Sequence, residues 1–226
     1  MSDCNIKFLS SLHHSPRQFE FHSSGDNILY GTITGKCYLS SLNTSELFDL
    51  GEYSIESTDS ILAISWLKSS PEKFIVGSAN GKITIEDINF KSNQQSIRNE
   101  FSKFPDLTSL HINCNDTSLI ASGHIDIVNI YDIETRIVVS SLSKIHDDHI
   151  NISRFANNNP NVFATSSFDK SAKLWDMRTL SNPIYTIKST SSLLMLTFSP
   201  NDNFLLTSGA DNCIIQVTFF TFFLSH

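Results

Sequence analysis

Cysteine is scarce in this sequence, and its spacing excludes two common kinds of structured site. The four cysteines, Cys4, Cys37, Cys114 and Cys213, lie far apart and form no CxxC pair. They fit neither a zinc site nor a dense disulfide framework, and they indicate a reducing compartment. We therefore expect an intracellular protein, nuclear or cytoplasmic or both, that holds no metal.

An excess of positive charge and a long apolar run are also missing. The formal net charge is −7, so the chain gains nothing from phosphate contacts through its net field and DNA is not an expected partner. The longest apolar run, near Val217 to Leu224, is too short for a helix that spans a bilayer, which needs about 20 residues. The N-terminus shows no signal-peptide pattern. We expect no membrane partner.

Patterns typical of enzymes are absent from the sequence as well. It has no Gly-rich phosphate loop, no paired acid–base carboxylates in a suitable context and no Cys/His nucleophile pair. No long window shows helical periodicity. We expect an all-β protein with no enzymatic activity and no cofactor.

Short β-type runs joined by polar turns make up most of the chain, and residues 163–178 give the clearest example. This stretch reads FATSSFDKSAKLWDMR, with one run ending near Ser166 and a second from Ala172 to Trp175. Asp169 stands in the polar turn between them, where an Asp side chain bonds backbone amides about two residues on. Two such runs joined by a tight turn predict a β-hairpin.

The same hairpin pattern occurs five times at a nearly constant spacing. The residues at the position of Trp175 are Ser40, Glu86, Tyr131, Trp175 and Val217. Subtracting neighbouring residue numbers gives spacings of 46, 45, 44 and 42. A further β-type run precedes each copy, and the last of these ends in Phe198-Ser199-Pro200.

This period and the Trp175-Asp176 dipeptide resemble the WD40 repeat, which has four strands in each blade of a β-propeller. The resemblance implies a WD40 β-propeller with about five recognisable blades. The expected organisation is a lead-in at 1–17, an array at 18–217 and an atypical apolar tail at 218–226, with copies at about 18–46, 61–90, 107–142, 150–187 and 193–217. Because WD40 rings most often have seven blades, we expect an incomplete, truncated propeller. The alternative is a small complete ring whose tail supplies a strand.

In WD40 blades a hydrogen-bonded set of His, Asp, Ser/Thr and Trp ties the strands together. The fourth copy matches this set through His146, Thr165, Asp169 and Trp175, and the resemblance implies a structural role for them. A buried indole N–H needs an acceptor, and a hydroxyl can pass the hydrogen bond on to an imidazole. We considered a Thr–His–Asp hydrolase triad and a metal site at His146–His149, and we prefer the structural interpretation for both.

The end of the fourth copy, Trp175-Asp176-Met177-Arg178, resembles the WDxR box of WD40 proteins that dock on the propeller adaptor of cullin-4 ubiquitin ligases. The residues that fit the box are Ala164, Thr165, Ser166, Ser167, Asp169, Leu174, Trp175, Asp176 and Arg178. The resemblance implies that Asp176 and Arg178 contact the adaptor, because a guanidinium suits bidentate pairing at an interface. The alternative is that Arg178 forms only a local surface ion pair with Asp176.

Three functions follow from these observations. The first is a substrate receptor of a cullin-4 E3 ubiquitin ligase, since the fourth and fifth copies look most like plant WD40 receptors of the UV-response and damaged-DNA-binding group. The second is a general WD40 scaffold without a ligase link. The third, a binder of damaged DNA, lacks the added hairpin and basic surface that such members use. The substrate protein stays unknown.

Overall fold

The computed structural model describes residues 15–42, 59–89 and 100–218, and these ranges form seventeen β-strands and no helix. The strands gather into five sheets, and every pairing within them is antiparallel. Each sheet contains only strands that follow one another in the sequence, so each is a local unit. We number these units blades 1 to 5. They confirm the all-β fold with five recognisable blades.

The strand bounds repeat with the spacing that the sequence indicates. Blade 1 contains β1 (Pro16–Phe21), β2 (Asn27–Thr32) and β3 (Cys37–Ser41). Blade 2 contains β4 (Ile61–Trp66), β5 (Lys73–Ser78) and β6 (Ile83–Asp87). Blade 3 contains β7 (Leu107–Ile112), β8 (Ser118–Gly123), β9 (Ile127–Asp132) and β10 (Val138–Ser143). Blade 4 contains β11 (Ile150–Phe155), β12 (Val162–Ser167), β13 (Ser171–Asp176) and β14 (Tyr185–Lys188). Blade 5 contains β15 (Leu193–Phe198), β16 (Phe204–Gly209) and β17 (Ile214–Thr218).

The strand register is the same from blade to blade, so residues in different blades occupy equivalent positions. In blade 4, Trp175 on β13 pairs with Phe163 on β12. The pairs at this position in the other blades, in chain order, are Ser40–Ile28, Glu86–Phe74, Tyr131–Leu119 and Val217–Leu205. The residues that the sequence repeat aligns with Trp175 therefore stand at one structural position in all five sheets.

The hydrophobic core lies between blades. One buried apolar cluster joins blades 1 and 2 and includes Leu29 and Phe74, and another joins blades 2 and 3 around Phe104. A third joins blades 3 and 4 and includes Trp175, and the fourth joins blades 4 and 5. A single blade cannot bury both of its faces, so burial of apolar surface against the next blade stabilises the stack.

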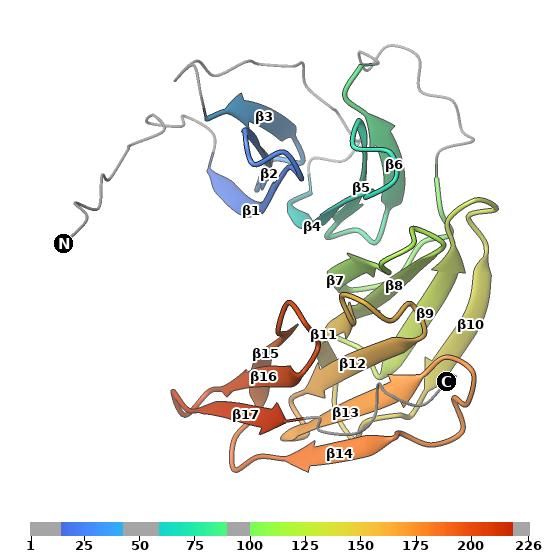
Figure 1. The fold of residues 1–226 in the computed structure, drawn as a ribbon, viewed down its shortest axis with the longest axis vertical. Coiled ribbons are helices and arrows are strands. Elements are labelled where there is room, and N and C mark those ends of the chain that lie inside the picture. Colours follow the sequence, from blue (N-terminus) through green and yellow to red (C-terminus); the bar gives the residue numbers. More distant parts are fainter. Residues whose placement is uncertain (1–14, 43–58, 90–99, 219–226) are drawn as a thin grey trace.

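The five blades follow one another around an arc (Figure 1). The first strand of each blade, β1, β4, β7, β11 or β15, lies on the inner side of this arc, and side chains from all five line one cavity. These inner strands are the first runs of the sequence repeat. The arc therefore has an inner wall built from one equivalent strand per blade.

Polar side chains in the loops after the inner strands link neighbouring blades. His22 Nε2 lies 3.0 Å from the carbonyl oxygen of Pro71, which joins blades 1 and 2. Asn113 Nδ2 donates to the carbonyl oxygen of Pro160 at 3.4 Å, which joins blades 3 and 4 in the same way. In both links an odd-numbered blade supplies the side chain and the following even-numbered blade supplies a proline carbonyl.

Two further links use a carboxylate. Asp116 of blade 3 accepts a hydrogen bond from the backbone N–H of Ser69 in blade 2. Asp202 of blade 5 accepts from the backbone N–H groups of Asn157 and Asn158 in blade 4, at 2.8 and 2.7 Å. Blade 4 supplies side chains at this junction as well, since Asn157 Nδ2 and Asn158 Nδ2 donate to the carbonyl oxygens of Ser199 and Pro200 in blade 5, each at 2.9 Å.

Candidate functional site

The turn between β12 and β13 is shaped by the carboxylate of Asp169. Its Oδ1 atom accepts hydrogen bonds from the backbone N–H of Ser171 at 2.8 Å and from the Ser171 hydroxyl at 2.7 Å. Lys170 takes a left-handed backbone conformation with φ of 68°, which the two bonds to the next residue stabilise. The turn thus brings β13 back beside β12, and Asp169 Oδ2 is available to accept hydrogen bonds from other groups.

That second oxygen begins a chain of hydrogen bonds across blade 4. Asp169 Oδ2 lies 2.8 Å from His146 Nδ1, and His146 Nε2 lies 2.8 Å from the hydroxyl of Thr165. The same hydroxyl oxygen accepts a hydrogen bond from Trp175 Nε1 at 3.0 Å. The structure therefore brings together all four residues that the sequence proposes as a hydrogen-bonded set.

The pKa shifts fix the direction of the protons in this chain. Burial lowers the pKa of His146, and the nearby Asp169 carboxylate only partly opposes that effect. Burial by itself raises the pKa of Asp169, but the Ser171 hydrogen bond, the His146 ring and the Asp147 amide together outweigh it and leave the pKa lowered. His146 is thus neutral at pH 7: Nδ1–H donates to Asp169, and Nε2 accepts from Thr165.

This arrangement links the strands of blade 4 through buried groups, which a hydrolase triad would have to expose. The side chains at its centre are buried, with Thr165 0% and His146 4% exposed. The Thr165 oxygen already accepts from Trp175, and its proton is donated to His146. A substrate carbonyl has no path to that hydroxyl, so a Thr–His–Asp contact of this kind is not a hydrolase triad.

Arg178 follows β13 directly and lies at the rim of blade 4. Its side chain is 57% exposed, whereas that of Asp176 is 14% exposed. The guanidinium binds the Asp176 carboxylate in a bidentate manner, with Nε 3.0 Å from Oδ1 and Nη2 2.6 Å from Oδ2. The hydrogen bond from the Arg178 side chain lowers the pKa of Asp176. The pair fixes the direction of Arg178 and leaves much of its guanidinium in solvent.

Blade 2 shows that this turn forms without an arginine. Asp87 occupies the position of Asp176, and its Oδ1 accepts from the backbone N–H of Asn89 at 2.8 Å. In blade 4 the corresponding bond joins Asp176 Oδ1 to the backbone N–H of Arg178 at 2.9 Å. The turn needs only the aspartate, so the guanidinium of Arg178 is an addition to it. Two other positions that the sequence aligns with Arg178, Asn43 and Phe220, lie outside the described residues.

The structure also shows the surroundings of His146–His149, the stretch that was considered as a metal site. His149 Nδ1 lies 2.8 Å from Asp148 Oδ1 at the surface, apart from the buried His146. Within the described ranges, no group of three His, Cys, Asp or Glu side chains is arranged to hold a metal ion. The cysteines of those ranges, Cys37, Cys114 and Cys213, are free thiols. No helix among the same residues is long and apolar enough to cross a membrane.

The sequence patterns did not reveal a polar ring on the inner wall of the arc. The penultimate residues of the five inner strands stand at equivalent register positions, and all five are polar. They are Glu20, Ser65, His111, Arg154 and Thr197. The signal was available, because they stand at one position of the repeat among mainly apolar neighbours. The hairpin repeat alone does not reveal them, because they lie on the first run of each repeat and not on the two hairpin strands.

Fold and repeat register define a WD40-repeat protein of the β-propeller class. A family model for the WD domain, G-beta repeat, matches residues 137–176 and 181–216. Among solved structures, a chain in a crystal structure of the mitotic checkpoint complex superposes with a TM-score of 0.81 over 96% of this chain and 68% of that one, at 15% identity. The expected WD40 resemblance is thus confirmed.

The chain is similar to two particular WD40-type relatives. It is 37% identical to Protein DWD HYPERSENSITIVE TO UV-B 1 of Arabidopsis thaliana over 89% of its own length and 27% of that protein. It is 30% identical to human DDB1- and CUL4-associated factor 10 over 49% of its length and 18% of that protein. The chain spans about a quarter or less of the length of these relatives. It is a WD40 protein-interaction module with homology to these two proteins.

Proposed function

We propose that this module serves in a substrate receptor of a cullin-4 E3 ubiquitin ligase and docks on the propeller adaptor of the ligase through its WDxR box. The names of the two relatives connect them with DDB1, CUL4 and the response to UV-B. The observation that carries the proposal for this chain is Arg178, an exposed guanidinium that its own turn does not require.

The geometry around Arg178 suits a contact with a protein partner. Asp176 holds Nε and Nη2 through two hydrogen bonds, so less side-chain entropy is lost when a partner binds. Within the described part of the chain, Nη1 of Arg178 has no hydrogen-bond partner. It is therefore available to acceptors on an adaptor surface, and arginine is enriched among the residues that dominate such interfaces.

A pull-down of the adaptor by the 226-residue chain tests this proposal. We expect Arg178→Ala to lower adaptor recovery by roughly tenfold or more, which is the size of effect seen for interface residues of high importance. Arg178→Lys should restore only part of the recovery, because an ammonium cannot reproduce the planar fork. Lys188→Ala, which removes an exposed cation from β14 of the same blade, is the matched control and should bind normally.

Two outcomes would argue against docking through the box. If Arg178→Ala and Lys188→Ala recover equal amounts of adaptor, the arginine is only a local ion pair of the blade. If the unmodified chain recovers no adaptor but retains other proteins, the module is a general WD40 scaffold without a ligase link. Thermal unfolding of each variant shows whether any loss of binding reflects loss of the fold.

A further inference from the structure

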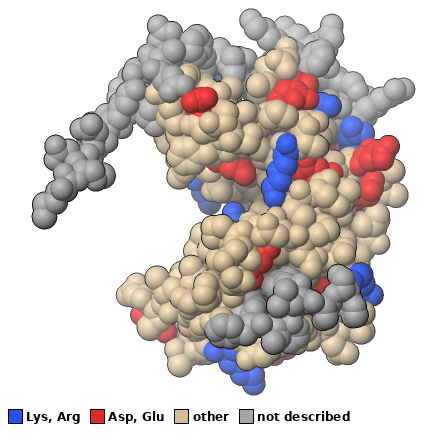
Figure 2. Space-filling model, in the orientation of Figure 1, with Lys and Arg blue, Asp and Glu red and all other residues tan. Residues whose placement is uncertain are grey.

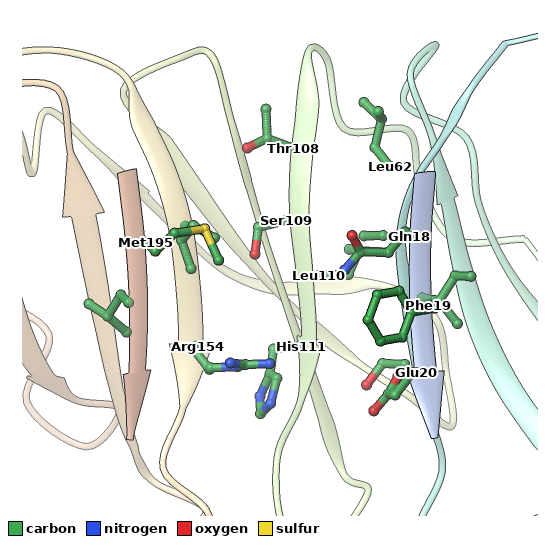
Figure 3. A pocket seen from close by; sticks show the side chains of 15 residues that line it. Gln18, Phe19, Glu20, Leu62, Thr108, Ser109, Leu110, His111, Arg154 and Met195 are labelled. Atoms are coloured by element: carbon green, nitrogen blue, oxygen red, sulfur yellow. The ribbon is translucent and has the colours of Figure 1, made fainter. Parts of the chain in front are cut away.

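Four residues of the polar ring, Glu20, Ser65, His111 and Arg154, line a cavity at the centre of the arc. The cavity has a volume of about 230 Å³, and β1, β4, β7, β11 and β15 all contribute to its lining. Figure 3 shows Glu20, His111 and Arg154 at one level of this cavity, each carried by a different inner strand. The surface is hollowed between the upper and lower blades in Figure 2, with both blue and red atoms around the hollow.

Arg154 is the half-buried cation of this ring, and its guanidinium is only partly satisfied. Nη1 donates to the Thr197 hydroxyl at 3.1 Å. Among the described residues, no carboxylate lies within ion-pair distance of it. Burial lowers the pKa of Arg154, although an arginine stays charged at neutral pH. Glu20 opposes that effect but forms no ion pair with Arg154, and a half-buried guanidinium that no carboxylate contacts is costly unless a ligand supplies one.

His111 presents a donor beside that guanidinium. Its Nδ1 atom accepts a hydrogen bond from the backbone N–H of Phe155 at 3.2 Å. Burial, and then the charges of Arg154 and Lys68, lower the pKa of His111 to about 3, so the ring is neutral at pH 7. With Nδ1 used as an acceptor, the proton resides on Nε2, which can only donate.

Glu20, which lies across the cavity from Arg154, supplies little negative charge at neutral pH. Burial raises the pKa of Glu20 to about 7, against the effects of the Trp66 amide, Arg154 and Lys68. Glu20 Oε2 is already used, since it accepts a hydrogen bond from the backbone N–H of Trp66 at 3.2 Å. At neutral pH much of Glu20 is protonated, so Arg154 and Lys68 leave a positive potential in a chain whose net charge is −7.

We propose that this cavity binds a carboxylate group carried on a short apolar stem. The guanidinium of Arg154 pairs with both carboxylate oxygens, and His111 Nε2–H donates to one of them. The stem lies against Phe19 and Met195, which line the same cavity and are 63% and 57% exposed. The carboxylate is either a side chain of a partner peptide or part of a small aliphatic acid. The site stands independently of docking through Arg178.

Calorimetric titration of the unmodified chain with three probes tests the site. The first probe is a short glutamate-containing peptide with blocked ends, the second is the same peptide with glutamine in place of glutamate, and the third is glutarate. We expect the glutamate peptide to bind roughly tenfold or more tightly than the glutamine peptide, because the charge-assisted bonds are lost with the amide. Binding by glutarate alone would assign the site to a small acid. Equal binding of the two peptides, with no glutarate binding, would overturn the proposal.

Variants then assign the binding to Arg154. Arg154→Gln should remove the preference for glutamate or glutarate, and Arg154→Lys should keep only part of it. Lys188→Gln makes the same change of charge in the same blade but on the outer strand β14, and it should bind like the unmodified chain. If Arg154→Gln does not fold, the comparison of glutamate and glutamine peptides on the unmodified chain still tests whether the cavity binds a carboxylate. An unchanged glutamate preference in folded Arg154→Gln would exclude Arg154 as the receptor of the carboxylate.

Discussion

At the scale of single residues, the hydroxyl of Thr165 is the centre of blade 4. It is completely buried, and it joins the Trp175 N–H to the His146 imidazole. Both neighbours lose their partner if the hydroxyl is removed, and a buried polar group without a partner is costly. The stability of the blade therefore depends on one oxygen atom.

We predict that Thr165→Val, which keeps the shape of the side chain, lowers the free energy of unfolding by roughly 2–4 kcal/mol. Thr165→Ser retains the oxygen and should cost clearly less. Urea unfolding followed by circular dichroism measures both variants. If valine and serine are equally destabilising, loss of the hydroxyl costs no more than loss of the methyl group in the serine variant, and the hydrogen-bond chain contributes little.

These residues could be predicted from the sequence because each one satisfies a local structural requirement. A tight turn favours an aspartate at position 169, and a buried tryptophan needs an acceptor, which Thr165 supplies. The ring of Glu20, His111 and Arg154 was not predicted, because its members are more than 40 residues apart and meet only after the blades stack. The partners of Glu20 and His111 are also backbone N–H groups of neighbouring strands, which no residue pattern reveals.

At the scale of structural elements, the loop at Asp202 clamps two blades together. Its carboxylate accepts from two backbone amides of blade 4, and the side-chain amides of Asn157 and Asn158 add a bond each at 3.1 Å. Asp202 itself has a φ of 57° and is 3% exposed. A positive φ is tolerated by aspartate, asparagine and glycine better than by other residues, so these three can be compared without backbone strain.

We predict that Asp202→Gly lowers the free energy of unfolding by roughly 2–3 kcal/mol, because the amides of blade 4 lose their charged acceptor. Asp202→Asn keeps one acceptor oxygen and should lose less. Hydrogen exchange of the Asn157 and Asn158 amides, measured by NMR, should become faster in the glycine variant. Unchanged exchange at both amides would contradict the clamp.

Sequence repeats and structural blades are offset by one strand in this chain. The family match over residues 137–176 contains the outer strand β10 of blade 3 and three strands of blade 4, and the match over 181–216 begins before β14 in the same way. Each repeat thus ties two blades together covalently. The sequence predicted the hairpins well, since their register is local, whereas the links made by His22, Asn113 and Asp116 depend on loops that meet only in the stacked molecule.

At the scale of the whole molecule, buried histidines and buried carboxyls change the stability in opposite directions as the pH changes. The folded pKa values of His146 and His111 lie below the ordinary value of 6.5. Their contribution to the free energy of unfolding is fully present above pH 6.5. It is lost as the pH falls, because the unfolded chain binds protons at a higher pH than the folded chain does. The pKa of Glu20 is raised from 4.5 to about 7, so its contribution is present below pH 4.5 and is lost as pH rises through 7.

Between pH 6.5 and 5 the two histidines oppose two carboxyls, since burial also raises the pKa of Glu86, and each proton changes the slope by about 1.4 kcal/mol per pH unit. We predict that, as the pH falls through this range, His111→Gln loses less stability than the unmodified chain, and that Glu20→Gln loses more. Thermal and urea unfolding at pH 5 to 8 measures all three chains. Identical pH profiles of the unmodified chain and His111→Gln would be inconsistent with a neutral buried His111.

The loop links also determine where new sequence can be introduced. The loop at 67–72 of blade 2 presents backbone groups to its neighbours, the carbonyl of Pro71 and the N–H of Ser69, and these groups are the same whichever residue supplies them. The corresponding loops of the other blades present particular side chains: His22, Asn113, Asp116, Asn157, Asn158 and Asp202. For protein engineering, the loop at 67–72 of blade 2 is therefore the better place to graft a foreign recognition sequence, whereas the corresponding loops of the other four blades must keep their native residues.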